Sequence, residues 1–343
     1  MACLSCRPVS RALVVQLPLP PCSVGCAMAR IPGRIDTHAH YLPPGYRAAL
    51  AAAGIDRPDG MPGVPTWDVD TQLALMDSIG IDVCILSVSS PGVHLGDDEA
   101  AGSLARLVND VGAATARGHP GRFGLFASLP LPDIAGSVQE IGRAFDDLGV
   151  DGVVMLTNSR GLYQGDKALE PVYAELDRRE ARVFIHPTSP ACCEQTALGR
   201  PRPMLEFLFD STRAVANLVL NGVIARYPAI EWIIPHGGAA LPVVVDRMAG
   251  FSAVAHACPD SPRIDVLGAV QRMHYDLAGF PLPHQLPALL GLVGTDRLLY
   301  GSDWPFTPAA AVTVLAAALD GTELVDADIL RANALRLFPR FAG

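Results

Sequence analysis

The sequence predicts an α/β fold, a (β/α)8 TIM barrel, and three observations carry this prediction. Short apolar runs rich in β-branched residues recur eight times along the 343-residue chain. Helix-like segments separate these runs, as the crossovers between parallel strands require. Polar residues of catalytic type follow several of the runs, where a barrel places its functional groups. A doubly wound sheet is the alternative fold for the same alternation.

The eight apolar runs are the expected strands: residues 34–40, 83–90, 122–131, 152–158, 182–187, 230–238, 273–279 and 298–306. The segments between them carry apolar residues at helical spacing. In the first, Leu73 and Met76 lie on one face and Gly80 gives a stop signal. The expected helices are residues 67–79, 97–117, 134–148, 169–179, 204–226, 241–255, 286–292, 309–319 and 326–337.

One domain is expected over residues 34–343, because residues 34–338 contain no repeat and no low-complexity linker. Residues 1–33 are expected to be an N-terminal extension that is disordered, or that reflects a start site assigned too early, with Met28 as the true start. Prolines interrupt the apolar centre that a secretory signal would need, at Pro18, Pro20 and Pro21.

Composition excludes several classes of partner. The net charge of −9 argues against a nucleic-acid surface, which needs a basic stripe. The longest uncharged stretch near the start, residues 12–29, is broken by prolines, so no membrane span is expected. Half of the eight cysteines lie in the extension, and the adjacent Cys192 and Cys193 have poor geometry for a structural disulfide. A reducing cytoplasm is therefore the expected location.

Four histidines and one aspartate stand at the expected carboxyl ends of strands. His38 and His40 end the first strand and point to the same side, because they are two residues apart. His186 ends the fifth strand, His236 the sixth and Asp303 the eighth. Imidazole and carboxylate suit zinc, and also manganese or iron. Three histidines and one aspartate complete a site with room for water or substrate, which leaves His236 as an acid/base or hydrogen-bonding partner.

The motifs that hold these residues resemble those of the amidohydrolase superfamily. They are His38–His40, His186-Pro187, His236–Gly238 and residues 301–305, in the order found in that superfamily. The resemblance covers nearly all of residues 34–340 and lies in the branch of aminocarboxymuconate-semialdehyde decarboxylase and the hydroxybenzoate decarboxylases. Within this branch the chain is most similar to 6-methylsalicylate decarboxylases, in residues 58–62, 89–92, 127–132 and 183–188.

The resemblance implies a barrel of the metal-dependent hydrolase type that binds one divalent metal ion, Zn²⁺ in preference to Mn²⁺, through His38, His40, His186 and Asp303. It also implies a non-oxidative decarboxylase that converts 6-methylsalicylate into 3-methylphenol (m-cresol) and CO2. Asp303, once protonated, would donate a proton to the ring carbon that bears the carboxylate, and His236 would act beside the metal. Two alternatives stay open: a mononuclear hydrolase of a lactone or amide, and a decarboxylase of a muconate-semialdehyde-like acid.

Three further residues are expected to bind the small aromatic acid. Arg247 lies on the helix after the sixth strand, and the resemblance implies that it reaches the site of a neighbouring subunit in a homodimer or larger homo-oligomer. His94 and Trp304 are expected to line the pocket. Related enzymes hold a second carboxylate with an arginine near residues 61–67, and its absence here suggests a substrate with a single carboxylate.

Overall fold

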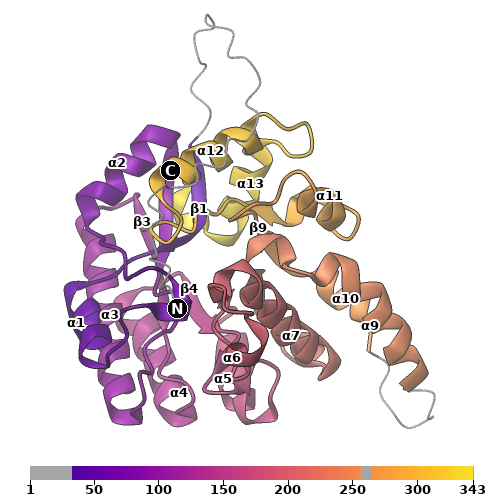
Figure 1. The fold of residues 1–343 in the computed structure, drawn as a ribbon, viewed down its shortest axis with the longest axis horizontal. Helices are drawn as coiled ribbons and strands as arrows, with labels where there is room; N and C mark the ends of the chain where they lie inside the picture. Colours follow the sequence, from indigo (N-terminus) through magenta and orange to yellow (C-terminus); the bar gives the residue numbers. More distant parts are fainter. Residues whose placement is uncertain (1–32, 256–263, 343) are drawn as a thin grey trace, which may run out of the picture. The chain divides into compact units, whose positions relative to one another are not determined.

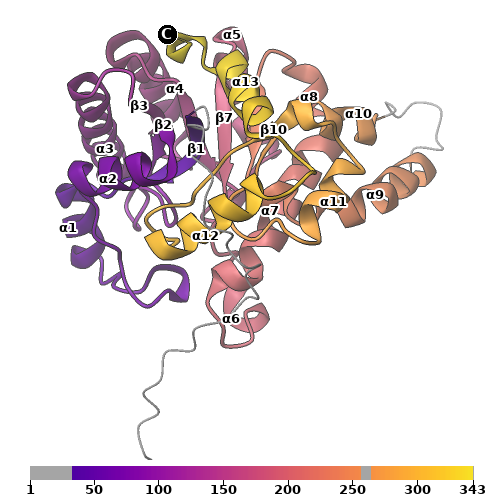
Figure 2. The ribbon, with the colours of Figure 1, turned by 90° about the horizontal axis from the view of Figure 1, so that it is seen from above.

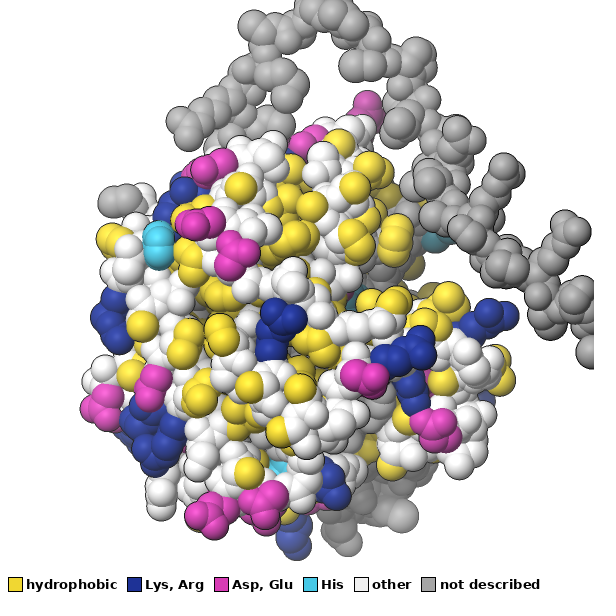
Figure 3. Space-filling view, turned by 60° about the vertical axis from the view of Figure 1, so that its left-hand side comes forward, with side chains coloured by type: hydrophobic (Ala, Val, Ile, Leu, Met, Phe, Trp, Pro, Cys, Tyr) yellow, Lys and Arg dark blue, Asp and Glu magenta, His cyan; other side chains and the backbone are white. Residues whose placement is uncertain are grey.

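The computed structural model of this chain describes residues 33–255 and 264–342. The expected extension, including Met28, lies outside the described residues except for Gly33. None of the helices in the described ranges combines the length and the apolar character needed to cross a membrane. On the face in Figure 3, basic side chains stand singly or in small groups between hydrophobic and acidic ones.

Eight parallel strands form the barrel wall within the described residues, which confirms the predicted fold. They follow the order β1-β2-β3-β4-β7-β8-β9-β10. Their bounds are β1 Arg34–His40, β2 Ile81–Ser87, β3 Phe123–Ser128, β4 Gly152–Leu156, β7 Arg182–His186, β8 Glu231–Ile234, β9 His274–Asp276 and β10 Leu298–Leu299. Bridges from Asp36 to Tyr300 and from Ala39 to Trp304 join the first strand to the segment after the last one and close the barrel.

Seven of the eight strands end earlier than predicted, and in β8 and β10 this happens because the site residues leave the extended conformation. The run 230–238 gives a strand only to Ile234, and the run 298–306 gives one only to Leu299. His236 and Asp303 have φ angles of 53° and 57°, in the left-handed region that extended backbone cannot enter. Both residues therefore stand on sharp turns above the barrel wall.

Helices surround the strands, as Figures 1 and 2 show. The predicted ones are α2 Val69–Ile79, α3 Asp98–Gly118, α4 Ile134–Arg143, α5 Glu170–Arg178, α7 Glu206–Leu220, α9 Leu241–Ala255, α11 Gln285–Leu290, α12 Ala309–Asp320 and α13 Ala327–Leu337. Local signals set their ends. In α2, Asp68 caps the first turn by accepting a hydrogen bond from the Thr71 N–H, and Gly80 ends the helix with a φ of 70°.

Some elements differ from the prediction. The helix predicted over 204–226 is interrupted, because Gly222 has a φ of 68° and separates α7 from the short α8, Val223–Arg226. The sequence reasoning missed α1 Pro44–Ala52, α6 Cys193–Thr196 and α10 Val266–Gln271. It also missed a small hairpin of β5 Asn158–Ser159 and β6 Leu162–Tyr163, which follows β4.

The barrel interior is filled by one side chain or two from each of several strands, and α13 covers its amino end. The interior cluster includes Ile35, Val83, Ile85, Phe126, Val154, Phe184, Ile233 and Leu299, together with Leu337, Phe338 and Phe341 from α13 and the turn that follows. Arg331 of α13 binds the Gly33 carbonyl, just before β1, and Arg340 binds Asp151, just before β4. With the amino end closed, the carboxyl ends of the strands are left for the site.

Candidate active site

Four of the predicted site residues meet at the carboxyl end of the barrel. His38 and His40 come from β1, His186 from the end of β7 and Asp303 from the turn after β10, and one nitrogen or oxygen atom of each lies within 4.8 Å of the others. The Asp303 Oδ1 atom is 3.2 Å from the His40 Nε2 and 3.5 Å from the His38 Nε2. The three histidines are buried, whereas the Asp303 side chain keeps 21% of its surface exposed.

A neighbouring acceptor holds each of the three imidazoles through its Nδ1 atom. His38 Nδ1 lies 2.9 Å from Asp276 Oδ2, His40 Nδ1 lies 3.0 Å from the Ser87 Oγ, and His186 Nδ1 lies 2.7 Å from the Pro187 carbonyl. An Nδ1–H that donates to an oxygen leaves the lone pair on Nε2, which is the tautomer that binds metal ions. All three Nε2 atoms are therefore available to one ion.

The residues present fit a divalent metal ion. The Nε2 atoms of His38 and His40 are buried and have no hydrogen-bond partner in the described part of the chain. A buried polar atom without a partner carries a free-energy cost, and coordination to a cation would remove it. Burial lowers the pKa of His40 and His186, so both stay in the neutral form that coordination needs. Burial also lowers the pKa of His38, but Asp276 outweighs it and raises that pKa to about 10, so an ion that binds the Nε2 atom of His38 would displace a proton from it.

Asp276 is a site residue that the sequence reasoning missed. It is fully buried at the end of β9, and its Oδ1 accepts hydrogen bonds from the backbone N–H groups of His236 and Ala278, each at 3.0 Å. Burial raises the pKa of Asp276, but the charge of His38 outweighs burial and lowers it. The rule that found the other residues, a charged group at the carboxyl end of an apolar strand, applies to Asp276 as well.

His236 lies beside the cluster. Its Nε2 atom is 3.9 Å from the Asp303 Oδ2, and its buried Nδ1 atom has no hydrogen-bond partner among the described residues. Burial raises the pKa of Asp303, but the neighbouring imidazoles of His236 and of the two β1 histidines outweigh burial and hold that pKa well below its usual range. Asp303 is therefore a carboxylate in the free protein.

The cluster opens into a cavity of about 440 Å³ with a largely apolar wall. The wall includes Met61, Met204, Phe207, Leu208, Phe280 and Phe306. Phe306 also packs edge-on against His40, with ring centres 5.7 Å apart. The sequence reasoning missed a second acid in this wall, Asp59, which accepts a hydrogen bond from Ser189. No arginine or lysine of the described chain lines this cavity.

The three residues predicted to bind substrate lie elsewhere. His94 lines a neighbouring, second cavity, and its Nε2 atom is 2.7 Å from Asp98. Trp304 lies beside the cluster in sequence, but it is not among the residues that line either cavity. Arg247 is exposed on α9, where its guanidinium lies 4.8 Å from the centre of the Phe251 ring. Within one chain, Arg247 is not part of the pocket wall.

Comparisons with known proteins agree with this geometry. A family model described as amidohydrolase matches residues 35–340. The 6-methylsalicylic acid decarboxylase acuB of Aspergillus aculeatus is 36% identical over 326 residues, which cover 90% of this chain and 96% of that protein. A crystal structure of an amidohydrolase II superposes with a TM-score of 0.84 at 38% identity, covering 90% and 100% of the two chains. A 2,6-dihydroxybenzoate decarboxylase in complex with 2,6-dihydroxybenzoate gives a TM-score of 0.76 at 26% identity, covering 90% and 100%.

Proposed function

We propose that this chain, which belongs to the amidohydrolase family and is a metal-dependent aromatic-acid decarboxylase, converts 6-methylsalicylate into 3-methylphenol and CO2. The observation that carries this choice of substrate is the composition of the pocket wall. A carboxylate needs a cation, and within one chain the cavity offers a place for one only at the metal cluster, because its described wall has no arginine or lysine. A substrate with a single carboxylate and an otherwise apolar ring fits such a cavity.

The ring substituents of 6-methylsalicylate match the two ends of the pocket. Its carboxylate and the neighbouring hydroxyl form a chelating pair that suits the cluster of His38, His40, His186 and Asp303. Its methyl group suits the apolar wall near Phe280 and Phe306. A bound metal ion would supply positive charge that offsets the negative charge of the two substrate oxygens, and it would orient the ring. The nitrogen-rich ligand set favours Zn²⁺, with Mn²⁺ as the alternative.

Asp303 moves the proton in the proposed reaction. Because Asp303 is ionised in the free protein, the proton that it delivers must arrive with the substrate. We infer that Asp303 accepts the proton of the ring hydroxyl on binding and passes it to the ring carbon that bears the carboxylate. The bond between that carbon and the carboxylate then breaks, its electron pair returns to the ring, and CO2 leaves. The phenolate product finally takes one proton from water.

His236 and Arg247 are assigned supporting roles. His236, whose Nε2 atom is 3.9 Å from Asp303, would form a hydrogen bond to the ring hydroxyl oxygen of the substrate while Asp303 transfers the proton. Arg247 would reach the carboxylate only from a neighbouring subunit, so this assignment requires a homodimer or larger homo-oligomer. His94 and Trp304 lie outside the cavity wall and take no part in this scheme.

The test incubates the purified, metal-loaded protein with a panel of ortho-hydroxybenzoates and measures CO2 and the phenol product. The expected result is that kcat/KM is highest for 6-methylsalicylate and falls for ring acids with a second carboxylate. The matched control is the same panel with Asp303→Asn protein. A tenfold preference for another acid would replace the proposed substrate, and absence of CO2 from every acid would refute the decarboxylase assignment.

A further inference from the structure

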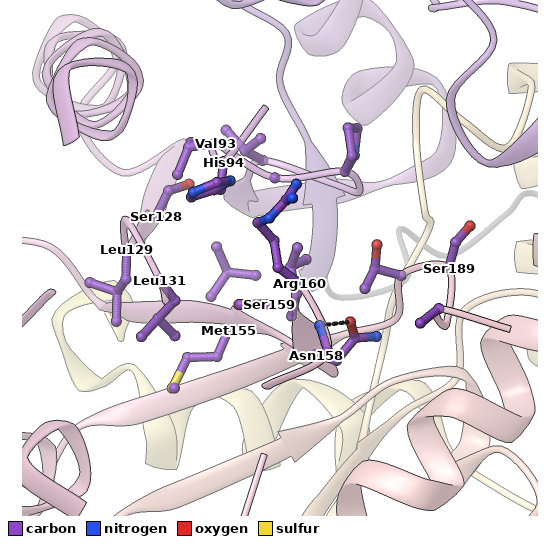
Figure 4. A pocket seen from close by; sticks show the side chains of 18 residues that line it. Val93, His94, Ser128, Leu129, Leu131, Met155, Asn158, Ser159, Arg160 and Ser189 are labelled. Carbon is purple, nitrogen blue, oxygen red and sulfur yellow. Dashed lines mark hydrogen bonds between the residues drawn. The ribbon is translucent and has the colours of Figure 1, made fainter. Parts of the chain in front are cut away.

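A second cavity, of about 190 Å³, lies at the carboxyl ends of β2, β3 and β4 (Figure 4). Two hydrogen bonds separate it from the metal pocket. The hydroxyl oxygens of Ser90 and Thr188 lie 2.7 Å apart in one hydrogen bond, and the Ser189 hydroxyl donates the other to Asp59. Ser90 and Asp59 line the metal pocket, whereas Thr188 and Ser189 line the second cavity. The two cavities are therefore neighbours with a polar wall between them.

The second cavity has the size and the surface for an aromatic ring. Its apolar lining includes Val93, Leu129, Leu131, Val154, Met155 and Leu156. An apolar cavity of about 150 Å³ is large enough to hold benzene. A six-membered ring therefore fits here, with its polar substituent directed to the cavity mouth.

Two polar groups of this cavity, the buried Ser128 hydroxyl and the exposed Arg160 guanidinium, have no hydrogen-bond or ionic partner among the described residues. The Ser128 Oγ atom is buried and makes no hydrogen bond within the described residues. No ion pair or hydrogen bond of the Arg160 guanidinium occurs there either, and no aspartate or glutamate of the described chain lines the cavity. His94, by contrast, is already engaged, since it accepts from the Gly96 N–H and contacts Asp98. Among the described residues that line this cavity, Arg160 therefore carries an unpaired positive charge.

The backbone at Arg160 adopts a strained conformation at the edge of this cavity. Arg160 and Gly161 form the two-residue turn between β5 and β6, with φ angles of 52° and 86°. A turn with positive φ at both positions favours asparagine or glycine, so arginine is strained there. Asn158 anchors the turn by accepting from the Gly161 N–H at 3.1 Å. Figure 4 shows the Arg160 side chain reaching across the cavity toward His94. Strain of this kind points to a role for the side chain.

We propose that this second cavity is a binding site for one small aromatic monocarboxylate of the size of benzoate. The ring lies against Leu129, Leu131 and Met155, and the carboxylate pairs with the Arg160 guanidinium, which offers two parallel N–H donors. The Ser128 hydroxyl meets the ligand from the buried side. This site requires neither the metal ion nor the proposed reaction.

The test is calorimetric titration of the metal-loaded protein with benzoate, which has no ring hydroxyl to donate a proton to Asp303. The wild-type protein is expected to bind two equivalents, one in each cavity, and Arg160→Asn is expected to bind one. Loss of a charge-assisted pair weakens the second site about tenfold or more. Arg160→Lys should keep the site with reduced affinity, since it keeps the charge but not the paired donors. Benzamide, which has the same shape without charge, should not occupy the site.

Two controls separate this outcome from misfolding. Asparagine is suited to a positive φ, so Arg160→Asn should melt at the same temperature as the wild type or above it. Arg106→Asn, at an exposed position of α3, should keep both equivalents. Equal stoichiometry in wild type and Arg160→Asn, or equal binding of benzamide and benzoate, would overturn the proposal. Because no turnover is measured, failure of the decarboxylase assignment would leave this result intact.

Discussion

Asp276 and His38 form a fully buried pair, with Oδ2 of the carboxylate 2.9 Å from Nδ1 of the imidazole. The other carboxylate oxygen accepts the backbone N–H of His236. One side chain at the end of β9 thereby orients a metal ligand on β1 and the turn that carries the neighbouring histidine. Asp276 is a positioning residue for both.

The first prediction concerns this pair. Asp276→Asn should weaken metal binding about 10- to 100-fold, because loss of an outer-shell carboxylate has effects of that size. The measurement is competition with a chelator of known affinity. The matched control is Glu231→Gln, which changes the partner of His274 at the opposite end of the barrel, where the pair lies at 3.2 Å. Equal metal affinity of Asp276→Asn and wild type would remove Asp276 from the metal site.

The second prediction concerns Asp303. Asp303→Asn should lower kcat by about 10²- to 10⁴-fold even with excess metal, because asparagine cannot carry the proton. Steady-state kinetics at several metal concentrations separate weaker metal binding from lost proton transfer. A variant that keeps more than about a tenth of the wild-type kcat would take Asp303 out of the proton path.

The third prediction concerns metal removal and stoichiometry. A chelator should abolish activity and destabilise the fold, by about 2.7 kcal/mol relative to protein with free metal at a hundred times its Kd. Thermal unfolding with and without Zn²⁺ or Mn²⁺ measures this loss. Elemental analysis should find one ion per chain, because the described residues bring together one group of metal-ligating side chains, that of His38, His40, His186 and Asp303. Two fully occupied ions per chain would contradict the mononuclear site.

The fourth prediction concerns Asp59 and pH. Burial raises the pKa of this carboxyl, so the folded state holds its proton more tightly than the unfolded state does. The ionised Asp59 carboxylate therefore lowers the free energy of unfolding at pH values above the pKa that this group has in the unfolded chain. Below that pKa the loss of stability disappears. Asp59→Asn, which keeps an acceptor for Ser189, should raise the melting temperature near pH 7.5 and change it less near pH 4.5. A larger gain at the acidic pH would refute the raised pKa.

The fifth prediction concerns Arg247 and the oligomer. Val243, Phe251 and Val254 are exposed on the same helix as Arg247, with 76%, 63% and 74% of their surfaces accessible. A second subunit would cover this face and receive the arginine. Arg247→Ala should lower kcat/KM by a factor of about 30 to several thousand, if the pair with the substrate is desolvated.

Mixing two inactive variants tests whether Arg247 acts in a neighbouring subunit. A mixed dimer of Arg247→Ala and His186→Ala chains has one site with neither defect, so activity should partly return under conditions of subunit exchange. If exchange is demonstrated and activity stays absent, Arg247 serves its own chain or has no role in the site.

The barrel and its metal cluster could be predicted because both depend on regular spacing. The two-residue period of a strand places His38 and His40 on one side, and the carboxyl-end rule places His186 and Asp303 beside them. Asp276 obeys the same rule, but the predicted run 273–279 placed it in the middle of a strand, whereas the strand ends at Asp276. The helix α10 is short as well, with six residues, and gives too few turns for a clear period.

The cavity walls could not be predicted in the same way. Asp59 and Arg160 stand on turns with positive φ, where no periodic pattern indicates which way a side chain points. Asp59 enters the metal pocket through its hydrogen bond with Ser189, which is 130 positions further along the chain. His94 lies behind the wall that Ser90 and Thr188 form, so its place in the second cavity follows from contacts between loops.

The closure of the barrel also sets the order in which the active site can be completed during synthesis. His38 and His40 emerge from the ribosome with the first strand, whereas Asp303 emerges after the last strand and docks onto β1 through the bond from its N–H to the His38 carbonyl, at 2.8 Å. Gly301 allows this docking, because a Cβ atom there would lie 2.8 Å from that of His38. A nascent chain therefore holds an incomplete set of metal ligands until almost the whole domain has been translated. Chains truncated before this point would lack the aspartate ligand and would leave β1 without its bridges to Tyr300 and Trp304.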